Sequence, residues 1–198
     1  LNRNAIKPEN VDHYIDLVKN SPKYNAVVID FKDDNGKLTY ESGVDVVNEI
    51  GSDEGAVIED LEKFIQRFKD EGIYTIARIV TFKDPYLADH KTEWALEKKD
   101  GSVWLGPNNV KWIDPYKKDM WNYVMSIVEE ISASGIDEIQ YDYIRFPENA
   151  VKVDQEVQYA NDEGKSKAEL IEEFLKYSNE RLEKYPVLAS ADVFGLVT

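Results

Sequence analysis

Apolar positions along the chain follow two different periods, and the two periods occupy different segments. Four segments repeat apolar residues at the three- and four-residue spacing of one helical face, which predicts helices at residues 10–21, 56–72, 115–135 and 166–182. Four shorter segments are rich in β-branched and aromatic residues, which predicts strands at residues 25–32, 73–82, 136–146 and 187–195. A further short helix, carrying Trp94 and Leu96, is expected after Pro85.

Local signals mark the ends of these segments. They are Gly72 and Gly135 as helix ends, Ser166 with Glu169 as a capping box, Asp114-Pro115 as a helix start and Asn35-Gly36 as a tight turn. Residues 147–165 are polar and have no clear period, so they predict a long loop after a strand.

Strands and helices alternate, which predicts a parallel sheet of the α/β class. Right-handed crossovers leave two arrangements open, an open doubly wound sheet and a closed barrel. We find no internal repeat or linker, so residues 1–198 are interpreted as a single domain.

Each predicted strand carries a charged residue late in its course. Successive side chains of a strand point to opposite faces, and the face opposite the charges is apolar or aromatic, as a helix-covered face requires. In a barrel the charges would therefore gather at the C-terminal mouth, where barrel enzymes place their chemistry. The residues concerned are Asp30, Arg78, Asp142 and Asp192, with Lys32 and Gln140 on the same sides.

A structural alternative stays open for every one of these residues. Strand-end charges also form ordinary ion-pair networks, and Asp30 with Arg78 is an example. Because four strands place charges at corresponding positions, we favour a functional site over four independent ion pairs.

Composition limits the choice of partner. Hydrophobic residues make up 42% of the 198 residues, which excludes a disordered chain. The net charge of −15 disfavours nucleic acid and anionic membrane surfaces, because like charges repel. There is no run of 18 apolar residues that would span a membrane, and no cysteine for disulfides, thiolate metal sites or a thiol nucleophile.

Four motifs occur in a recognisable order: "FKDP" at residues 82–85, "WIDPY" at 112–116, "DEIQYDYIRFP" at 137–147 and "ADVFG" at 191–195. Together they resemble a bacterial family of glycoside hydrolase domains with a TIM-barrel fold, allied to α-galactosidase-like and α-amylase-like barrels. The resemblance covers nearly the whole chain, and "YDYIRFP" is its most specific part. It implies a (β/α)8 barrel that acts on a carbohydrate.

The resemblance also implies roles for two carboxylates. Asp142 would end the fourth barrel strand, the nucleophile position of the allied glycosidases. Asp192 would end the fifth strand, where α-amylase-like enzymes keep the acid/base; α-galactosidase-like enzymes take that group from the sixth strand. Glycoside hydrolysis needs such a pair, since one carboxyl protonates the leaving oxygen and the other attacks the sugar or activates water.

Other residues are candidates for binding the sugar. Arg78 and Arg145 would hold Asp142 ionised by proximity. Polar contacts to sugar hydroxyls are expected from Asp30, Lys32, Arg78, Gln140 and Arg145. Aromatic platforms are expected at Trp112, Trp104, Tyr141 and Tyr143, with helix–sheet packing as the alternative for each and the favoured one for both tyrosines.

The chain is shorter than a whole barrel of about 250 residues. The predicted strands correspond to barrel strands two to five, so we expect a partial barrel, with strand one before Leu1 and strands six to eight after Thr198. Exposed edges of such a sheet predict self-association.

Competing functions are weaker or remain open. The "DDNGK" segment lacks the closing glutamate of a calcium loop, and His13 and His90 are isolated, so we expect no metal and no cofactor. A non-catalytic carbohydrate-binding or cell-wall-associated barrel is the alternative function, and a purely structural domain is a third. The resemblance and the absent cysteine suggest an extracellular or cell-envelope protein.

Overall fold

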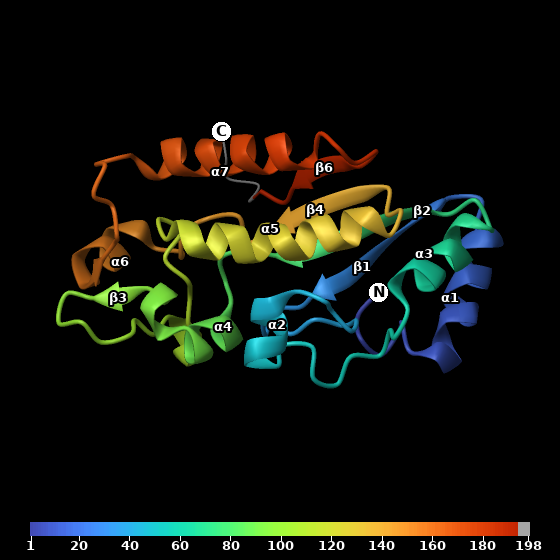
Figure 1. The fold of residues 1–198 in the computed structure, drawn as a ribbon, viewed down its shortest axis with the longest axis horizontal. Coiled ribbons are helices and arrows are strands. Elements are labelled where there is room, and N and C mark those ends of the chain that lie inside the picture. The colour runs from blue at the N-terminus through green and yellow to red at the C-terminus, as the bar shows by residue number, and fades with distance from the viewer. Residues whose placement is uncertain (194–198) are drawn as a thin grey trace.

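A sheet of four parallel strands forms the centre of the computed structural model, which describes residues 1–193 (Figure 1). The strands lie in the order β1-β2-β4-β6 and span Ala26–Lys32, Tyr74–Val80, Glu138–Asp142 and Leu188–Ala191. Each neighbouring pair is parallel, so every connection is a crossover. The predicted α/β class with a parallel sheet is confirmed.

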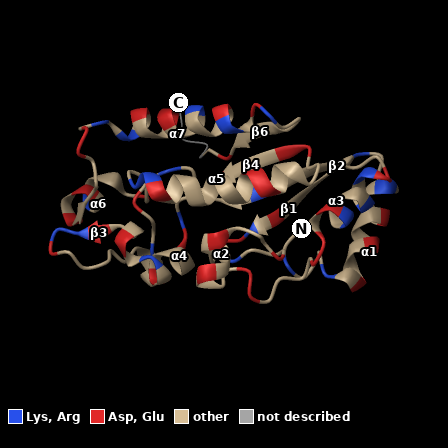
Figure 2. Cartoon of the chain, in the orientation of Figure 1, with Lys and Arg blue, Asp and Glu red and all other residues tan. Residues whose placement is uncertain are grey.

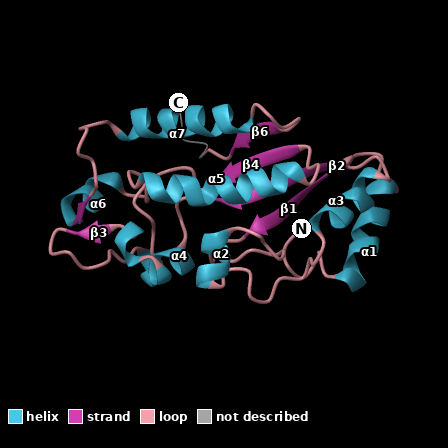
Figure 3. Ribbon diagram, in the orientation of Figure 1, coloured by secondary structure: helices cyan, strands magenta, loops and turns pink. Residues whose placement is uncertain are grey.

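Helices precede and connect these strands. They are α1 (Pro8–Lys19), α2 (Asp45–Ile50), α3 (Leu61–Lys69), α4 (Pro85–His90), α5 (Lys118–Ala133), α6 (Ala150–Glu156) and α7 (Lys167–Leu182). Two short 3-10 helices, Thr92–Trp94 and Pro107–Asn109, lie in the segment after α4. A second, two-stranded antiparallel sheet pairs β3 (Glu97–Lys98) with β5 (Val157–Gln158). Figure 3 shows it beyond the ends toward which the four long strands point.

The two faces of the large sheet differ. One face is buried, because α3 packs on β2, α5 packs on β4, and α7 lies beside α5 (Figure 1). Its side chains include Val27, Ile29, Phe31, Ala77, Ile79, Ile139 and Tyr141, all nearly inaccessible to solvent. The opposite face leaves Asp30, Arg78, Gln140 and Asp142 partly exposed. The period-2 pattern of the sequence therefore separates a covered face from an open one.

Several local predictions are confirmed. Ser166 and Glu169 form the capping box of α7. Residues 33–37 form a tight turn, in which the Gly36 N–H donates to the Asp33 carbonyl oxygen at 3.0 Å. Gly36 has φ +83°, a left-handed conformation that glycine adopts without strain.

Other predicted boundaries are wrong. Helix α5 begins at Lys118 rather than at Pro115, because the Asp114 side chain accepts the Tyr116 and Ala160 N–H groups and closes a turn instead. Helix α3 begins only at Leu61, since Asp60 caps it by accepting the Lys63 N–H. Leu96 lies beyond the short helical segments that follow Pro85.

Residues 147–165 are not one long loop. They contain α6 and β5, and β5 gains its strand partner from β3, about sixty residues earlier. Strand β4 also ends earlier than predicted, at Asp142, because Tyr143 takes a left-handed φ of +51°. Of the predicted fourth strand, residues 194 and 195 lie outside the described part of the chain.

The edges of the large sheet differ as well. At β1 the backbone of Leu1 lies alongside, and the Asp30 N–H donates to the Leu1 carbonyl oxygen at 3.0 Å. At β6 the Leu188 side chain is 64% exposed. Self-association through these edges stays a prediction. Within residues 1–193, no helix combines the length and apolarity needed to cross a membrane.

Candidate active site

The open face of the sheet carries a row of polar side chains across its strands. Strand pairing places Asp30 beside Arg78, Arg78 beside Gln140, and Gln140 beside Ser190. Asp142 and Asp192 come next, at the C-terminal ends of β4 and β6, where the Asp192 N–H donates to the Tyr141 carbonyl oxygen at 2.8 Å. Residues far apart in the sequence therefore meet at one rim, which is what the strand-end pattern predicted.

Arg78 is the centre of this rim. Its Nε and Nη2 both donate to Oδ2 of Asp142, at 2.8 and 2.5 Å. Its Nη1 donates to Asp30 at 3.1 Å, and its Nη2 also contacts Asp34 at 3.4 Å. Burial lowers the pKa of Arg78, but the Asp142 hydrogen bond and the three carboxylate charges more than offset it, so the pKa is raised. Arg78 is thus a fixed cation that neutralises part of a carboxylate cluster.

Asp142 is held from two sides. Arg78 binds Oδ2, while Oδ1 accepts the backbone N–H of Tyr143 at 2.6 Å. That second bond is made by a non-glycine residue in the left-handed region, a conformation that costs free energy and is found at functional sites. Both interactions fix the orientation of the carboxylate, and the side chain remains 22% exposed.

Asp192 lies beside Asp142 but has a different environment. Its Oδ1 accepts the Gln140 side-chain N–H at 3.0 Å, a neutral partner. Partial burial, together with the neighbouring charge of Asp142, raises the pKa of Asp192, and Arg78 opposes the shift only in part. Two carboxyl groups on adjacent strands therefore have different partners, a guanidinium at Asp142 and an amide at Asp192.

Two rim residues were missed by the sequence analysis. Asp34 lies in the turn after β1, and Lys83 follows β2; their side chains pair at 3.3 Å. The Lys83 Nζ also donates to the Tyr143 hydroxyl at 3.2 Å. Both residues stand in segments that the sequence marked, the "DDNGK" turn and the "FKDP" motif, but neither lies in a strand whose period would orient it.

Lys32 does not belong to the rim, although the alternation along β1 predicted it there. The register of β1 against β2 shifts between Asp30 and Lys32, and this irregularity turns Lys32 to the covered side. Its side chain is completely buried, where it pairs with the buried Asp84 at 2.7 Å. A direct contact between Lys32 and a ligand on the open face is therefore excluded by its burial.

The predicted aromatic platforms are largely packed. Trp104 and Tyr141 are 4% and 0% exposed, and Trp112 is 6% exposed. Trp112 and Tyr143 meet edge to face at 5.9 Å. The Arg145 guanidinium lies 5.3 Å from the Trp112 ring and 5.0 Å from the Tyr143 ring.

Arg145 also binds Glu148 at 3.1 Å. Arg78 therefore contacts Asp142 as predicted, while Arg145 lies against the rings of Trp112 and Tyr143.

Charge elsewhere is widely spread. Figure 2 shows acidic segments over the strands and most helices rather than in one patch, in keeping with the net charge of −15. Among residues 1–193, no group of three or more histidine, aspartate or glutamate side chains is arranged to hold a metal ion. The charged groups at the rim are the carboxylates of Asp30, Asp34, Asp142 and Asp192, the guanidinium of Arg78 and the ammonium of Lys83.

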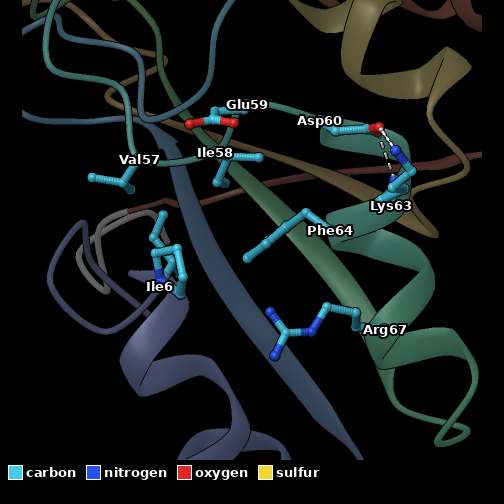
Figure 4. A pocket seen from close by; sticks show the side chains of 9 residues that line it. Ile6, Val57, Ile58, Glu59, Asp60, Lys63, Phe64 and Arg67 are labelled. Atoms are coloured by element: carbon cyan, nitrogen blue, oxygen red, sulfur yellow. Dashed lines mark hydrogen bonds and ion pairs between the residues drawn. The ribbon is translucent and has the colours of Figure 1, made fainter.

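A pocket of about 260 Å³ lies on the helical side of the molecule (Figure 4). Ile6, Ile58 and Phe64 supply its apolar surface, and Figure 4 shows Asp60 and Lys63 paired at its margin. The pocket is a groove between the start of α1, residues 57–60 and α3.

The fold and the rim together define the class. Four parallel strands with helices on one face, and polar side chains at the strand ends, are the arrangement of part of a (β/α)8 barrel. A sequence model of the family described as "Putative glycosyl hydrolase domain" matches residues 2–198, and the chain belongs to that family.

Solved structures agree on the fold. A crystal structure of a hypothetical protein from Ruminiclostridium thermocellum ATCC 27405 is 39% identical, with a TM-score of 0.85, and the match covers 100% of this chain and 98% of that one. An alpha-galactosidase from Lactobacillus brevis is 13% identical, with a TM-score of 0.61, over 93% of this chain and 24% of that chain. An alpha-galactosidase from Thermus thermophilus in complex with stachyose is 12% identical, with a TM-score of 0.59, over 94% of this chain and 37% of that chain.

The chain thus spans well under half the length of these two alpha-galactosidases. A comparison with curated protein sequences found no match.

Proposed function

We propose that this domain hydrolyses O-glycosidic bonds of an oligosaccharide or polysaccharide at the open rim, with Asp142 and Asp192 as its two carboxyl groups. Family membership and a sheet shared with glycosidase barrels support the general class. The observation that carries the proposal is the pair of carboxyl groups on adjacent strand ends, one bound by Arg78 and the other by Gln140.

Each carboxyl fits one role in glycoside hydrolysis. Asp142 is held in place by Arg78 and by a backbone N–H, and it serves as the nucleophile or as the base that activates water. Asp192 has a raised pKa, so it keeps a proton to higher pH and serves as the acid for the leaving oxygen. Asp30, Gln140 and Asp34 are placed to accept or donate hydrogen bonds to sugar hydroxyls.

The test is turnover on a panel of neutral, amino and acidic glycans, followed by matched amide substitutions. Asp142→Asn should reduce the hydrolysis rate by at least about 10³-fold, because an amide neither attacks nor activates water. Asp137→Asn is the control: Asp137 precedes the same strand at the opposite end and binds the Thr75 N–H and hydroxyl. It should leave the rate within a few-fold.

Three outcomes would decide the matter. Loss of turnover in Asp142→Asn alone, with glycan binding retained, supports hydrolysis at the rim. Equal losses in both variants would mean that the site is elsewhere or that the fold has failed. Binding of a glycan by the unaltered protein without any turnover would replace the proposal by a carbohydrate-binding role.

A further inference from the structure

Two loops complete the rim and carry Asp34 and Lys83. Asp34, in the turn after β1, reaches Arg78 at 3.4 Å and Lys83 at 3.3 Å. Lys83, after β2, reaches the Tyr143 hydroxyl at 3.2 Å. Neither residue lies in a strand or helix, and the Asp34 side chain is 48% exposed. Their positions therefore depend on the contacts that hold the two loops.

A buried ion pair lies behind these loops. The Lys32 Nζ and the Asp84 carboxylate are 2.7 Å apart, and both side chains are completely inaccessible to solvent. The Lys32 Nζ also donates to the Val80 carbonyl oxygen at 2.8 Å, and Asp84 Oδ1 accepts the Leu87 N–H at 2.8 Å. One buried pair thus joins the end of β1, the end of β2 and the start of α4.

The turn that carries Asp34 rests on this pair. A Cβ added at Gly36 would lie 1.9 Å from Asp84 Oδ1 and 3.1 Å from Tyr86 Cβ. Within the turn, Asp33 Oδ1 accepts the N–H groups of Asn35 and Lys37 at 2.9 and 3.1 Å. The turn therefore packs closely against Asp84, and Lys83 is the residue that precedes Asp84 in the chain.

The desolvation cost of the buried Lys32–Asp84 pair indicates a role other than stability alone. Removing two charges from water is costly, and uncharged residues of similar volume are often as stabilising. An ion pair adds direction, because each partner fixes the geometry of the other. We propose that Lys32 and Asp84 are positioning residues that hold Asp34 and Lys83 on the rim. That Asp34 and Lys83 would contact sugar hydroxyls rests on the function proposed above.

The experiment compares lysine acylation rates, measured by mass spectrometry of the intact folded chain, and needs no glycan. In Lys32→Met/Asp84→Asn both charges are removed while side-chain volume and the oxygen that caps α4 are kept. We expect the acylation rate of Lys83 to rise by at least about threefold, because the loops that shield it open more often. Gly36→Ala should raise it as well, since the added methyl displaces the turn from Asp84.

Two controls separate positioning from general loosening. Lys165, paired with Glu163 and Glu173 near α7, should keep its acylation rate in every variant. Val128→Ala, in the core of α5, lowers stability and should leave Lys83 unchanged. An unchanged Lys83 rate in both folded test variants, or an equal rise in Val128→Ala, would overturn the proposal. If the double variant does not fold, Gly36→Ala decides alone.

This result is independent of hydrolysis. If no glycan is cleaved but Lys83 responds as expected, the positioning role stands and the proposed function fails. Once a glycan substrate is found, the double variant should raise KM more than it lowers kcat.

Discussion

Two clusters of lysine, arginine and aspartate lie at the ends of β1 and β2, and they differ in almost every physical respect. The side chains of the cluster around Arg78 are partly exposed, and three carboxylates pair with its one guanidinium. The Lys32–Asp84 pair is completely buried and contains one charge of each sign. Asp30 and Lys32 are only two residues apart, yet a register shift sends them to opposite sides of the sheet.

The comparison distinguishes residues that a ligand can reach from residues that stabilise the fold. Charges that solvent and ligands can reach are useful for reaction, and they contribute little to stability. A buried pair cannot meet a ligand, but losing one partner leaves an uncompensated charge in a medium of low dielectric. We therefore expect substitutions in the first cluster to reduce activity and substitutions in the second to reduce stability.

After Asp142, the largest effect is expected at Asp192. Asp192→Asn should lower the hydrolysis rate by about 10²–10⁴-fold, the usual contribution of a general acid. The raised pKa of Asp192 also predicts the pH profile: the protonated acid is present at low pH and is lost as pH rises through that pKa. The rate of the unaltered protein should therefore fall on the alkaline side, and in Asp192→Asn this limb should disappear. An unchanged limb would assign the acid to another group.

The buried pair gives the next largest effect. Lys32→Met leaves the Asp84 carboxylate buried without a counter-charge and should cost about 3–5 kcal/mol in the free energy of unfolding. Lys32→Met/Asp84→Asn should recover most of that loss. Chemical denaturation measures both variants. Equal destabilisation of the single and double variants would show that the pair acts by packing and not by charge compensation.

Substitution of Arg78 tests the partly exposed cluster in the same way. Arg78→Met should lower kcat by about 10²-fold, because Asp142 loses two charge-assisted hydrogen bonds. The unfolding free energy should fall by less than in Lys32→Met, since the side chain is partly solvated. A stability loss as large as that of Lys32→Met would erase the distinction between the two clusters.

The smallest effect is expected at the start of α7, far from both clusters, and it serves as a control for stability without activity. Ser166→Ala removes the hydroxyl that accepts the Glu169 N–H at the start of α7 and should cost about 1 kcal/mol of stability. Activity should not change. Thermal unfolding together with the glycan assay checks both statements, and a loss of activity here would mean that the assay reports stability.

The sequence could predict most of the open face because a strand has a strict period. Asp30, Arg78, Gln140 and Asp142 share one side of the sheet as the alternation requires. The same rule failed at Lys32, since an irregularity in register has no signature in hydrophobic alternation.

Loops and small elements depended on contacts that no local pattern encodes. Asp34 and Lys83 meet across 49 residues of sequence, so their pairing follows from tertiary structure alone. Strand β5 forms against β3, and α6 lies in a polar segment whose composition resembles a loop. Caps and tight turns were predictable, because their hydrogen bonds lie within a few residues.

The central claim is that ligand and reaction meet on the open rim of the sheet. Its most direct measurement is the mapping of backbone amide chemical shifts in Asp142→Asn while the glycan that the unaltered protein cleaves is added. We predict saturable shifts at Gln140, Tyr143 and Asp192 and at the turn of residues 33–37. Shifts confined to α1 and α3, around the pocket of Figure 4, would contradict the account.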